Sequence, residues 1–336
     1  MKIGVIGWYG HNNAGDQRIL YSIQRYFSNC EFFVIDINTA PNHIREINTC
    51  NLVIFGGGGL ILRGFNIYAD LINSIKVPFV SIGISVEARH DDNINFIKAI
   101  EYKSEFIVVR DTQSAKLLDE QSKVIVAPDL TFLYPYEIVN PTEKDIWGLN
   151  LRHWYYWKSE HGSINHRVLV KLNKYFPWIK HLYFPPKWEP KYPVQILKSN
   201  VTELRPISLY GEITKNNDIQ ILSQFFETID IDNDFSDQLI DCRYFVSMRL
   251  HGLIFACQMG LPFISLSYQP KNYGFLEELG LRDLSVDIFK SEELENKIDL
   301  LRENYKDIRE RLIYFRNESN LKIHQTMDYL SKEMNL

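Results

Sequence analysis

The sequence lacks the features that mark several easily recognised classes of protein. Its four cysteines form no CxxC pair, and no apolar run approaches the roughly 18 to 20 residues that a membrane-spanning helix needs. The opening stretch MKIGVIGWYG is too short for the apolar core of a signal peptide, and we interpret it as a first strand. We therefore expect a protein of a reducing, cytoplasmic compartment with no structural metal.

Low-complexity tracts and an excess of basic residues are also missing. The formal net charge of −5 argues against a general nucleic-acid binder, because phosphate backbones require clustered lysine and arginine. Hydrophobic residues make up 45% of the chain, which excludes a disordered protein, and 336 residues are more than one core usually supports. We expect two folded domains, in which local anion sites can still occur.

The first half of the chain repeats one pattern. Short apolar runs predict strands at 2–7, 31–36, 52–55, 79–84, 106–109 and 124–127. Amphipathic stretches between them predict helices at 16–27, 68–75, 92–103 and 112–120, the last capped by Asp111. Continuous apolar strands that alternate with helices are typical of a parallel sheet covered on both faces, so this half predicts a Rossmann-like domain.

A second α/β domain follows a proline-containing linker at 134–144. Beyond a first strand in WGLNLRHW, we expect helices at 166–175, 237–242, 253–259 and 275–279, and strands at 179–184, 244–248 and 263–267. The predicted domains are 1–138 and 145–300, two Rossmann-like halves that face a central cleft, with C-terminal helices at 301–336.

Ligands of open parallel sheets bind at the carboxyl ends of the strands, so residues that directly follow strands are candidates for a site. The loop GWYGHNNAGD contains Asn12, Asn13 and Asp16. It is either a tight turn capped by Asp16 or a loop whose backbone N–H groups and asparagines meet a ligand. In FGGGGL, Gly57 and Gly58 permit positive φ and a close approach by a ligand or the opposite domain.

Other polar residues after strands are less distinctive. His90, Asp91 and Asp92 are possible metal ligands by type, but three adjacent polar residues before a helix are more typical of a solvated cap. Arg110 is either an interdomain ion pair or an anion contact, and Asp129 is expected to accept hydrogen bonds from nearby backbone.

The stretch SMRLHG places Arg249 and His251 between two apolar runs. If the strand at 244–248 stays extended, both side chains point to the same side, because side chains alternate with a period of two. Gly252 then allows a sharp entry into a helix whose N-terminal N–H groups favour an anion. An interdomain ion pair is the alternative for this pair of residues.

Two more strand ends support the anion site. Arg152 and His153 end the first strand of the second domain, and Tyr268 and Lys271 follow a later one. Lys271 is otherwise expected to be a solvated residue of a helix cap. Together with SMRLHG, these residues predict an anion-binding site.

Six stretches, in this order, resemble the polysaccharide pyruvyl transferase family. They are GWYGHNNAGDQRIL (7–20), NLVIFGGGGLI (51–61), VVRDTQSAKLL (108–118), PDLTF (128–132), LNLRHW (149–154) and SMRLHGLIFACQMGLPFISLSYQPK (247–271). Gln17 and Arg18 depart from the small or acidic pair expected after Asp16. The resemblance covers both halves, except for about 155–240 and the C-terminal helices.

The resemblance implies a GT-B-like fold and an enzyme of cell-surface polysaccharide or exopolysaccharide biosynthesis. This transferase, a pyruvyltransferase, would move the pyruvyl group of phosphoenolpyruvate onto two hydroxyls of a sugar, forming a cyclic ketal and releasing phosphate, without a cofactor. Planar guanidinium groups suit the carboxylate and phosphate of this donor. Arg152, Arg249, Lys271 and the N–H groups after Gly252 would therefore hold it.

Roles in the chemistry follow from the same resemblance. His251 is predicted to be the general acid or the proton donor to phosphate, and Asp16 or Asn12 to orient the acceptor sugar. The other residues expected in the acceptor or cleft loops are Asn13, Gly57, Gly58, Arg110 and Tyr268.

Two other functions stay open at this point. A GT-B glycosyltransferase that uses a nucleotide sugar would also suit the arginines, and a non-catalytic carbohydrate-binding protein is a third candidate. The aromatic residues of WYYW (154–157), Trp178 and Trp188 either pack in the core or stack on sugars. A lipid-linked oligosaccharide acceptor would bring the protein to the inner membrane face, and we expect no nucleic-acid partner.

Overall fold

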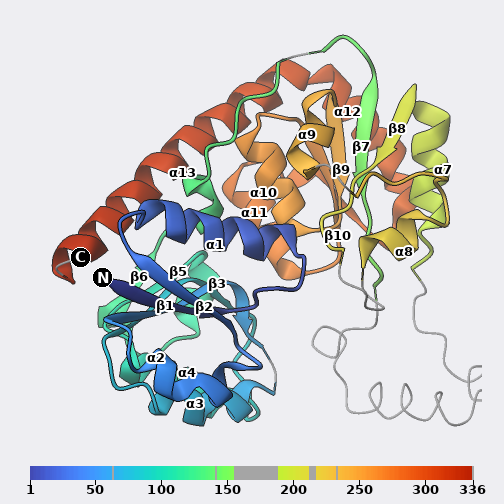
Figure 1. Cartoon of the computed structure of the whole chain (residues 1–336). Coiled ribbons are helices and arrows are strands. Elements are labelled where there is room, and N and C mark those ends of the chain that lie inside the picture. The colour runs from blue at the N-terminus through green and yellow to red at the C-terminus, as the bar shows by residue number, and fades with distance from the viewer. Residues whose placement is uncertain (63, 141, 155–187, 212–216, 232–233, 335–336) are drawn as a thin grey trace, which may run out of the picture. The chain divides into compact units, whose positions relative to one another are not determined.

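The computed structural model describes residues 1–62, 64–140, 142–154, 188–211, 217–231 and 234–334 (Figure 1). It divides the chain into unit 1, which is Met1–Glu137 with Tyr314–Leu336, and unit 2, which is Ile138–Ile313. Residues 301–336 were expected to form C-terminal helices separate from both domains. The boundary between the units instead falls inside one long helix, α13 (Tyr305–Glu333), whose later residues belong to unit 1.

Unit 1 is built on a six-stranded parallel sheet in the order β2-β1-β3-β4-β5-β6. Its strands are β1 (Lys2–Gly7), β2 (Glu31–Asp36), β3 (Leu52–Ile61), β4 (Phe79–Val86), β5 (Ile107–Val109) and β6 (Val124–Val126). Its helices are α1 (Ala14–Tyr26), α2 (Ile44–Ile47), α3 (Ala69–Asn73), α4 (Ile94–Lys103) and α5 (Thr112–Lys116). Helix α1 covers one face of the sheet, and α2, α3 and α4 cover the other (Figure 1).

Strand β3 is longer than predicted. The sequence indicated an end at Phe55, but the strand continues through the glycine run to Ile61. It does so because β4 stays paired with it, with Gly58 opposite Ile84 and Ile61 opposite Val86 across a register shift. The four glycines therefore lie within the sheet, close to its carboxyl edge.

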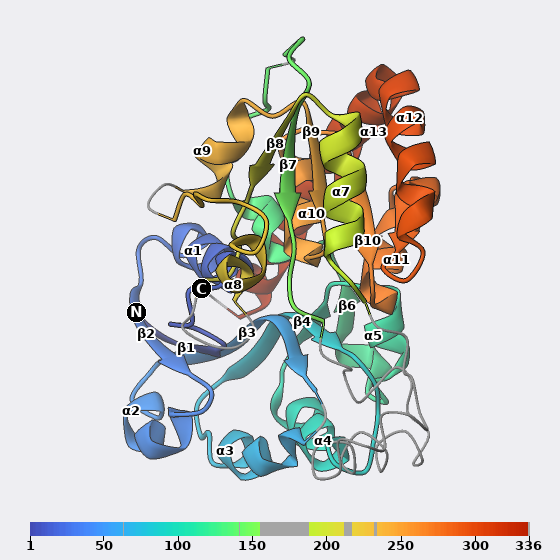
Figure 2. The same ribbon diagram turned by 90° about the vertical axis from the view of Figure 1, so that its right-hand side faces the viewer.

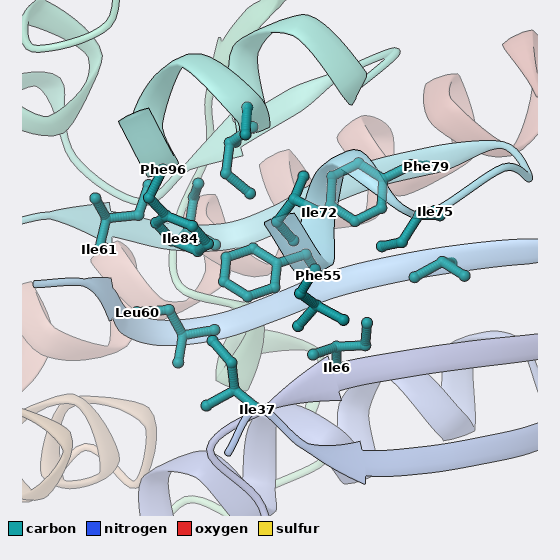
Figure 3. Packing of buried hydrophobic residues seen from close by; sticks show 14 of the residues in the cluster. Ile6, Ile37, Phe55, Leu60, Ile61, Ile72, Ile75, Phe79, Ile84 and Phe96 are labelled. Atoms are coloured by element: carbon teal, nitrogen blue, oxygen red, sulfur yellow. The ribbon is translucent and has the colours of Figure 1, made fainter. Parts of the chain in front are cut away.

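Aromatic side chains fill the core on one side of this sheet. Phe55, from β3, has its ring centroid 6.5 Å from that of Phe79 and 5.7 Å from that of Phe96, and the contact with Phe96 is edge-to-face (Figure 3). All three side chains are buried. Such pairs add to the free energy gained from removing the rings from water, and they fix β3 against β4 and α4.

Unit 2 contains a five-stranded parallel sheet in the order β11-β10-β9-β7-β8. Its strands are β7 (Ile146–Asn150), β8 (Glu203–Pro206), β9 (Tyr244–Ser247), β10 (Phe263–Ser267) and β11 (Ser285–Asp287). Its helices are α7 (Lys191–Asn200), α8 (Asp218–Leu222), α9 (Phe235–Ile240), α10 (Leu250–Gln258), α11 (Pro270–Glu278) and α12 (Leu294–Glu303). The helix predicted at 166–175 and the strand predicted at 179–184 lie outside the described residues.

The helices of unit 2 pack on both faces of its sheet. Helices α7 and α12 lie on one face and α9 on the other (Figure 2). The rings of Phe235 in α9 and Phe255 in α10 stack with centroids 4.6 Å apart. Both units are therefore doubly wound α/β folds, as predicted. In the part of the chain that the structure describes, no helix is both long and apolar enough to cross a bilayer.

Candidate active site

The carboxyl edge of the unit 2 sheet gathers most of the residues predicted to bind the donor. Strands β10, β9 and β7 are neighbours, and parallel strands end at the same edge. Arg152 follows β7, Arg249 follows β9, and Tyr268 follows β10. Residues far apart in the sequence therefore lie at adjacent strand ends.

Arg249 is held by a buried carboxylate that was not predicted from the sequence. Its Nε lies 2.9 Å from both side-chain oxygens of Asp218, and its Nη2 lies 2.6 Å from Oδ1. The Asp218 side chain is 0% exposed and that of Arg249 is 13% exposed. Burial disfavours the charge of Arg249, but the charge and hydrogen bonds of Asp218, together with Tyr268 and Tyr210, outweigh this effect. The pKa of Arg249 is therefore raised above its ordinary value.

Asp218 is itself held by two further donors. Asn150 Nδ2, at the end of β7, donates to Asp218 Oδ2 at 2.8 Å, and the backbone N–H of Leu209 donates to the same oxygen at 3.0 Å. Asn150 also donates to the backbone oxygen of Ile207 at 3.0 Å. A carboxylate with this many donors is fixed in position, so the guanidinium of Arg249 is fixed as well.

The predicted geometry of SMRLHG is wrong. Strand β9 ends at Ser247 and α10 begins at Leu250, so Arg249 is the N-cap residue and His251 lies in the first helical turn. The chain turns here because Ser247 Oγ accepts from the backbone N–H of Arg249 at 3.1 Å and donates to its carbonyl oxygen at 3.0 Å. A period of two cannot apply across this turn. The His251 ring stacks instead on Phe255, one helical turn later, with centroids 5.9 Å apart.

Gly252 is required by packing. A Cβ added at this position would lie 2.3 Å from Ser247 Oγ and 2.9 Å from Leu209 Cδ1. The absence of a side chain lets the first turn of α10 approach the end of β9 closely. Gly252 therefore holds together the turn that carries Arg249 and His251.

Arg152 is positioned by Tyr268. Its Nη1 donates to Tyr268 Oη at 2.7 Å, and its guanidinium carbon lies 5.2 Å from the centroid of the same ring. The next residue, His153, has a lowered pKa because burial disfavours its charged form and Arg152 adds repulsion, although Asp218 opposes both effects. Protonation of His153 is therefore less favourable than that of an ordinary histidine.

Lys271 lies in the first turn of α11 and is half-buried. Its neighbour Asn272 is buried and donates through Nδ2 to the backbone oxygen of Met248 at 3.0 Å. This bond joins the start of α11 to the end of β9. Lys271 thus belongs to the same edge of the sheet as Arg249.

In unit 1, the predicted loop lies where β1 and β3 end. Asn13 caps α1, with its side-chain oxygen accepting from the backbone N–H of Gly15 at 3.1 Å, so the predicted cap Asp16 lies in the first turn instead. Asn12 is exposed and has a positive φ of 51°. In a sheet of this order the chain leaves β1 and β3 in opposite directions, which is where such folds bind ligands.

Gly57 and Gly58 serve the protein's own packing. Both have positive φ, and a Cβ would lie 2.3 Å from Ile19 Cγ2 at Gly57 and 2.8 Å from Asp16 Oδ1 at Gly58. Helix α1 therefore takes the space that the glycines leave open. The Tyr9 hydroxyl donates to the backbone oxygen of Gly56 at 2.7 Å. Its burial, with a smaller contribution from the charge of the buried Asp16, raises the pKa of Tyr9.

Arg110 has a partner within its own unit. Its Nη1 lies 3.0 Å from Asp129 Oδ2, and both side chains are buried; its Nε also donates to Ser85 Oγ. Asp129 accepts from the backbone N–H of Thr131 at 3.0 Å, as expected from its position. Asp111 caps α5, as predicted, by accepting from the N–H of Ser114 at 2.6 Å.

His90, Asp91 and Asp92 form the turn before α4. The side-chain oxygen of Asn93 accepts from the N–H of His90 at 2.9 Å, which is typical of a cap. Among the described residues, no group of three or more histidine, cysteine or acidic side chains could hold a metal ion.

The sequence did not predict the carboxylates that hold other side chains in place, Asp218 beside Arg249 and Asp36 beside His11. Asp218 begins a short helix, where an acidic residue is common and carries no sign of a site. His11 lay in the quoted loop, but its carboxylate partner, Asp36, is 25 residues away at the end of β2. The only available signal was that each of these residues lies at a strand end or a helix start.

The fold is shared with several solved structures. UDP-GlcNAc 2-epimerase from Neisseria meningitidis bound to UDP-GlcNAc is 12% identical with a TM-score of 0.51, and 98% of this chain and 100% of that chain are covered. A Listeria monocytogenes protein assigned as UDP-N-acetylglucosamine 2-epimerase is also 12% identical, with a TM-score of 0.59 and coverage of 99% and 98%. A spinosyn rhamnosyltransferase complexed with spinosyn aglycone is 10% identical, with a TM-score of 0.50 and coverage of 98% and 100%. The chain has the GT-B fold, as predicted.

The sequence identifies the family. Residues 13–270, more than half of the chain, match the family model of polysaccharide pyruvyl transferase. The chain belongs to this family, and it is therefore an enzyme, a pyruvyltransferase of polysaccharide biosynthesis. A comparison with curated proteins finds no match.

Proposed function

We propose that the enzyme transfers the pyruvyl group of phosphoenolpyruvate onto two hydroxyls of a glycan sugar, forming a cyclic ketal and releasing phosphate. One observation carries this proposal. Arg152 and Arg249 lie at neighbouring strand ends of unit 2, one bonded to Tyr268 and the other to the buried Asp218. Two oriented guanidinium groups suit a small donor that carries both a carboxylate and a phosphate.

The charges at this edge favour an anion. Asp218 balances the charge of Arg249, so Arg249 contributes hydrogen bonds in a fixed direction. Arg152 and Lys271 add positive charge at the same edge, and the first N–H groups of α10 point out from the start of a nine-residue helix. Such helix N-termini bind phosphate and carboxylate groups. We assign Arg152, Arg249, Lys271 and the backbone at Gly252 to the donor.

His251 is assigned to proton transfer. In the proposed reaction, a proton adds to the methylene carbon of phosphoenolpyruvate, and a sugar oxygen bonds to the adjacent carbon while its hydroxyl proton is lost. The bond from that carbon to the phosphate oxygen then breaks, and the second hydroxyl forms the ketal as its proton passes to phosphate. A histidine can supply the first proton or pass on the last one, because its ordinary pKa is close to neutral.

The acceptor is assigned to unit 1. The loop after β1 presents Asn12 at the surface next to the capping Asn13, and Asp16 lies in the following helical turn. We propose that Asn12 or Asp16 orients the sugar. We further propose that the acceptor is a cell-surface glycan precursor, free or lipid-linked, which the protein meets in the cytoplasm or at the inner membrane face.

Phosphate release from phosphoenolpyruvate tests this function. The purified protein is incubated with a panel of galactose-, glucose- and mannosamine-containing acceptors, and we expect release that depends on both substrates. His251→Ala should lower the rate by about 100-fold or more, as expected for loss of a general acid, while the circular dichroism spectrum stays unchanged. Release by this variant at the wild-type rate would remove His251 from the chemistry.

A further inference from the structure

A groove in unit 1 has no part in the donor and acceptor assignments above. Helices α3 and α4 pack side by side on the sheet face opposite α1 (Figure 1 and Figure 2). The groove between them has a volume of about 510 Å³, which is within the range of roughly 300–1,000 Å³ typical of sites for small molecules. It is lined by residues of both helices and by Asn66, and we call it the α3–α4 groove.

Small side chains form the floor of the groove. Ala69 of α3 and Ala99 of α4 line it and are 8% and 4% exposed. A methyl group is too short to fill the space between two helices, so the gap above the alanines stays open. A ligand can therefore enter between the longer side chains on either side.

Asn66 fixes one end of the groove. Its Oδ1 accepts from the backbone N–H groups of Asn95 and Phe96 at 2.8 and 3.1 Å, and its Nδ2 donates to the backbone oxygen of Asp91 at 2.8 Å. The ring of Phe65, the preceding residue, meets that of Phe96 edge-to-face with centroids 5.6 Å apart. These contacts hold the start of α4 against the segment before α3. The groove is thus formed before a ligand binds, which lowers the entropy cost of binding.

The walls of the groove offer hydrogen-bonding groups. Asp70, Asn73 and Asn95 line it and are exposed, and in the described part of the chain no residue is hydrogen-bonded to these three side chains. Amides donate and accept, and a carboxylate accepts, so together they suit hydroxyl groups, which also do both. The charged residues of the described lining, Asp70 and Lys98, are of opposite sign. The groove therefore suits an uncharged polar ligand better than an anion or a cation.

Tyr102 adds an aromatic surface. Its side chain lines the groove and is 79% exposed. An aromatic ring in this position presents an apolar face to a ligand while its hydroxyl stays in water. A pyranose ring has an apolar face of C–H groups and hydroxyls around its edge. It can stack on Tyr102 while its hydroxyls reach the walls.

We propose that the α3–α4 groove is a carbohydrate-binding site for an uncharged sugar residue of the glycan. Tyr102 stacks on the sugar ring, and Asp70, Asn73 and Asn95 bind its hydroxyls. Such a site holds a glycan on the enzyme through a residue other than the one that reacts. The inference goes beyond the proposed function. It uses the membership of the chain in a family of polysaccharide biosynthesis, and neither the donor nor the ketal.

Fluorine NMR on the whole chain tests the site. meta-Fluorotyrosine replaces Tyr102 in one sample and Tyr314 in the control, because Tyr314 is also 68% exposed on a helix and belongs to unit 1. Methyl β-galactoside, methyl β-glucoside and N-acetylmannosamine are added without phosphoenolpyruvate. We expect at least one sugar to shift the signal at position 102 saturably and to leave the signal at position 314 in place. No saturable shift at position 102 with any of the sugars, or equal shifts at both positions, would overturn the proposal.

The walls are tested by Asn73→Ala, with Asn317→Ala as its control on the exposed side of α13. Asn73→Ala should raise the Kd read from the signal at position 102 by roughly three- to tenfold, as for the loss of one or two hydrogen bonds. Asn317→Ala should leave the Kd unchanged. The same Kd in both variants would show that the groove does not bind the sugar.

Phosphate release measures the proposed function separately. Tyr102→Ala should release phosphate from phosphoenolpyruvate with a monosaccharide acceptor at the wild-type rate, because the groove holds a sugar other than the reacting one. Absence of release by the wild type would refute the proposed function and would not affect the sugar titration. Loss of release in Tyr102→Ala, with an unchanged circular dichroism spectrum, would overturn the separate site and place Tyr102 in the reaction.

Discussion

Asp218 fixes Arg249 at the carboxyl edge of the unit 2 sheet. It is fully buried and bonds to Arg249, Asn150 and the backbone of Leu209, so removing its charge leaves the guanidinium without its counter-charge. The sequence could not predict this role, because residues 218 and 249 are related only through the sheet. What could be predicted was the position of Arg249 at a strand end.

Asp218→Asn should therefore cost about 3–5 kcal/mol of stability, the usual effect of breaking a buried ion pair from one side. It should also raise the phosphoenolpyruvate KM, because Arg249 is no longer oriented. Urea unfolding and steady-state kinetics measure the two effects.

A surface ion pair provides the control for that variant. Glu203 Oε1 lies 2.5 Å from Arg205 Nε, but the two side chains are 48% and 33% exposed. Glu203→Gln should change stability by no more than about 0.5 kcal/mol. Equal losses in the two variants would show that burial of the Asp218 pair has no special importance.

Gly252 gives a second prediction for a single residue. Gly252→Ala places a Cβ 2.3 Å from Ser247 Oγ, and we expect it to cost about 1–3 kcal/mol through overpacking. Gly274→Ala, in α11, meets no atom within 4 Å and should be neutral or stabilise by up to about 1 kcal/mol. A shift of the urea midpoint in the same direction for both variants would contradict the packing role of Gly252.

Among the elements, strands were easier to predict than their ends. Strands β1, β2 and β10 have the bounds that their continuous apolar runs indicated. The ends of β3 and β9 differed for physical reasons that lie outside the local pattern. Pairing with β4 extends β3 through its glycines. The hydrogen bond of Ser247 turns the chain after β9, so α10 begins at Leu250, two residues before Gly252, where the entry into the helix was expected.

The contact between α1 and β3 can be tested through Gly57. Gly57→Ala combines a positive φ of 86° with a Cβ only 2.3 Å from Ile19 Cγ2. Gly64→Ala has a similar φ of 80° but meets nothing within 4 Å, so it should show the cost of the backbone alone, roughly 1–2 kcal/mol. We expect Gly57→Ala to lose at least about 1 kcal/mol more in urea unfolding. Equal losses of stability in Gly57→Ala and Gly64→Ala would mean that α1 does not need the space left by the missing side chain of Gly57.

For the whole molecule, the regular alternation of strands and helices was sufficient to predict two doubly wound α/β units. The division of α13 was not predictable, because its amphipathic pattern continues without a break across Ile313 and Tyr314. The part of α13 that belongs to unit 1 carries three buried apolar side chains, which are Ile323, Met327 and Leu330. A charged helix at the end of a sequence gives no indication of which core it completes.

Two neighbouring positions test this assignment of the C-terminal segment. Ile323 is 0% exposed and Leu321 is 55% exposed. Ile323→Ala should cost about 2–5 kcal/mol, whereas Leu321→Ala should stay within about 0.5 kcal/mol. In Ile323→Ala, hydrogen exchange should show reduced protection of the strands of unit 1. Reduced protection in unit 2 alone would contradict the assignment of the later part of α13 to unit 1.

The identity of the donor is tested most directly by ligand-induced stabilisation, since a ligand that binds the native state alone raises the unfolding midpoint. Phosphoenolpyruvate at about 100 times its Kd should stabilise the protein by roughly 2.7 kcal/mol. Arg152→Ala should abolish this effect. UDP-N-acetylglucosamine at the same concentration should leave the midpoint unchanged. Stabilisation by the nucleotide sugar and none by phosphoenolpyruvate would contradict the assignment and favour a glycosyltransferase.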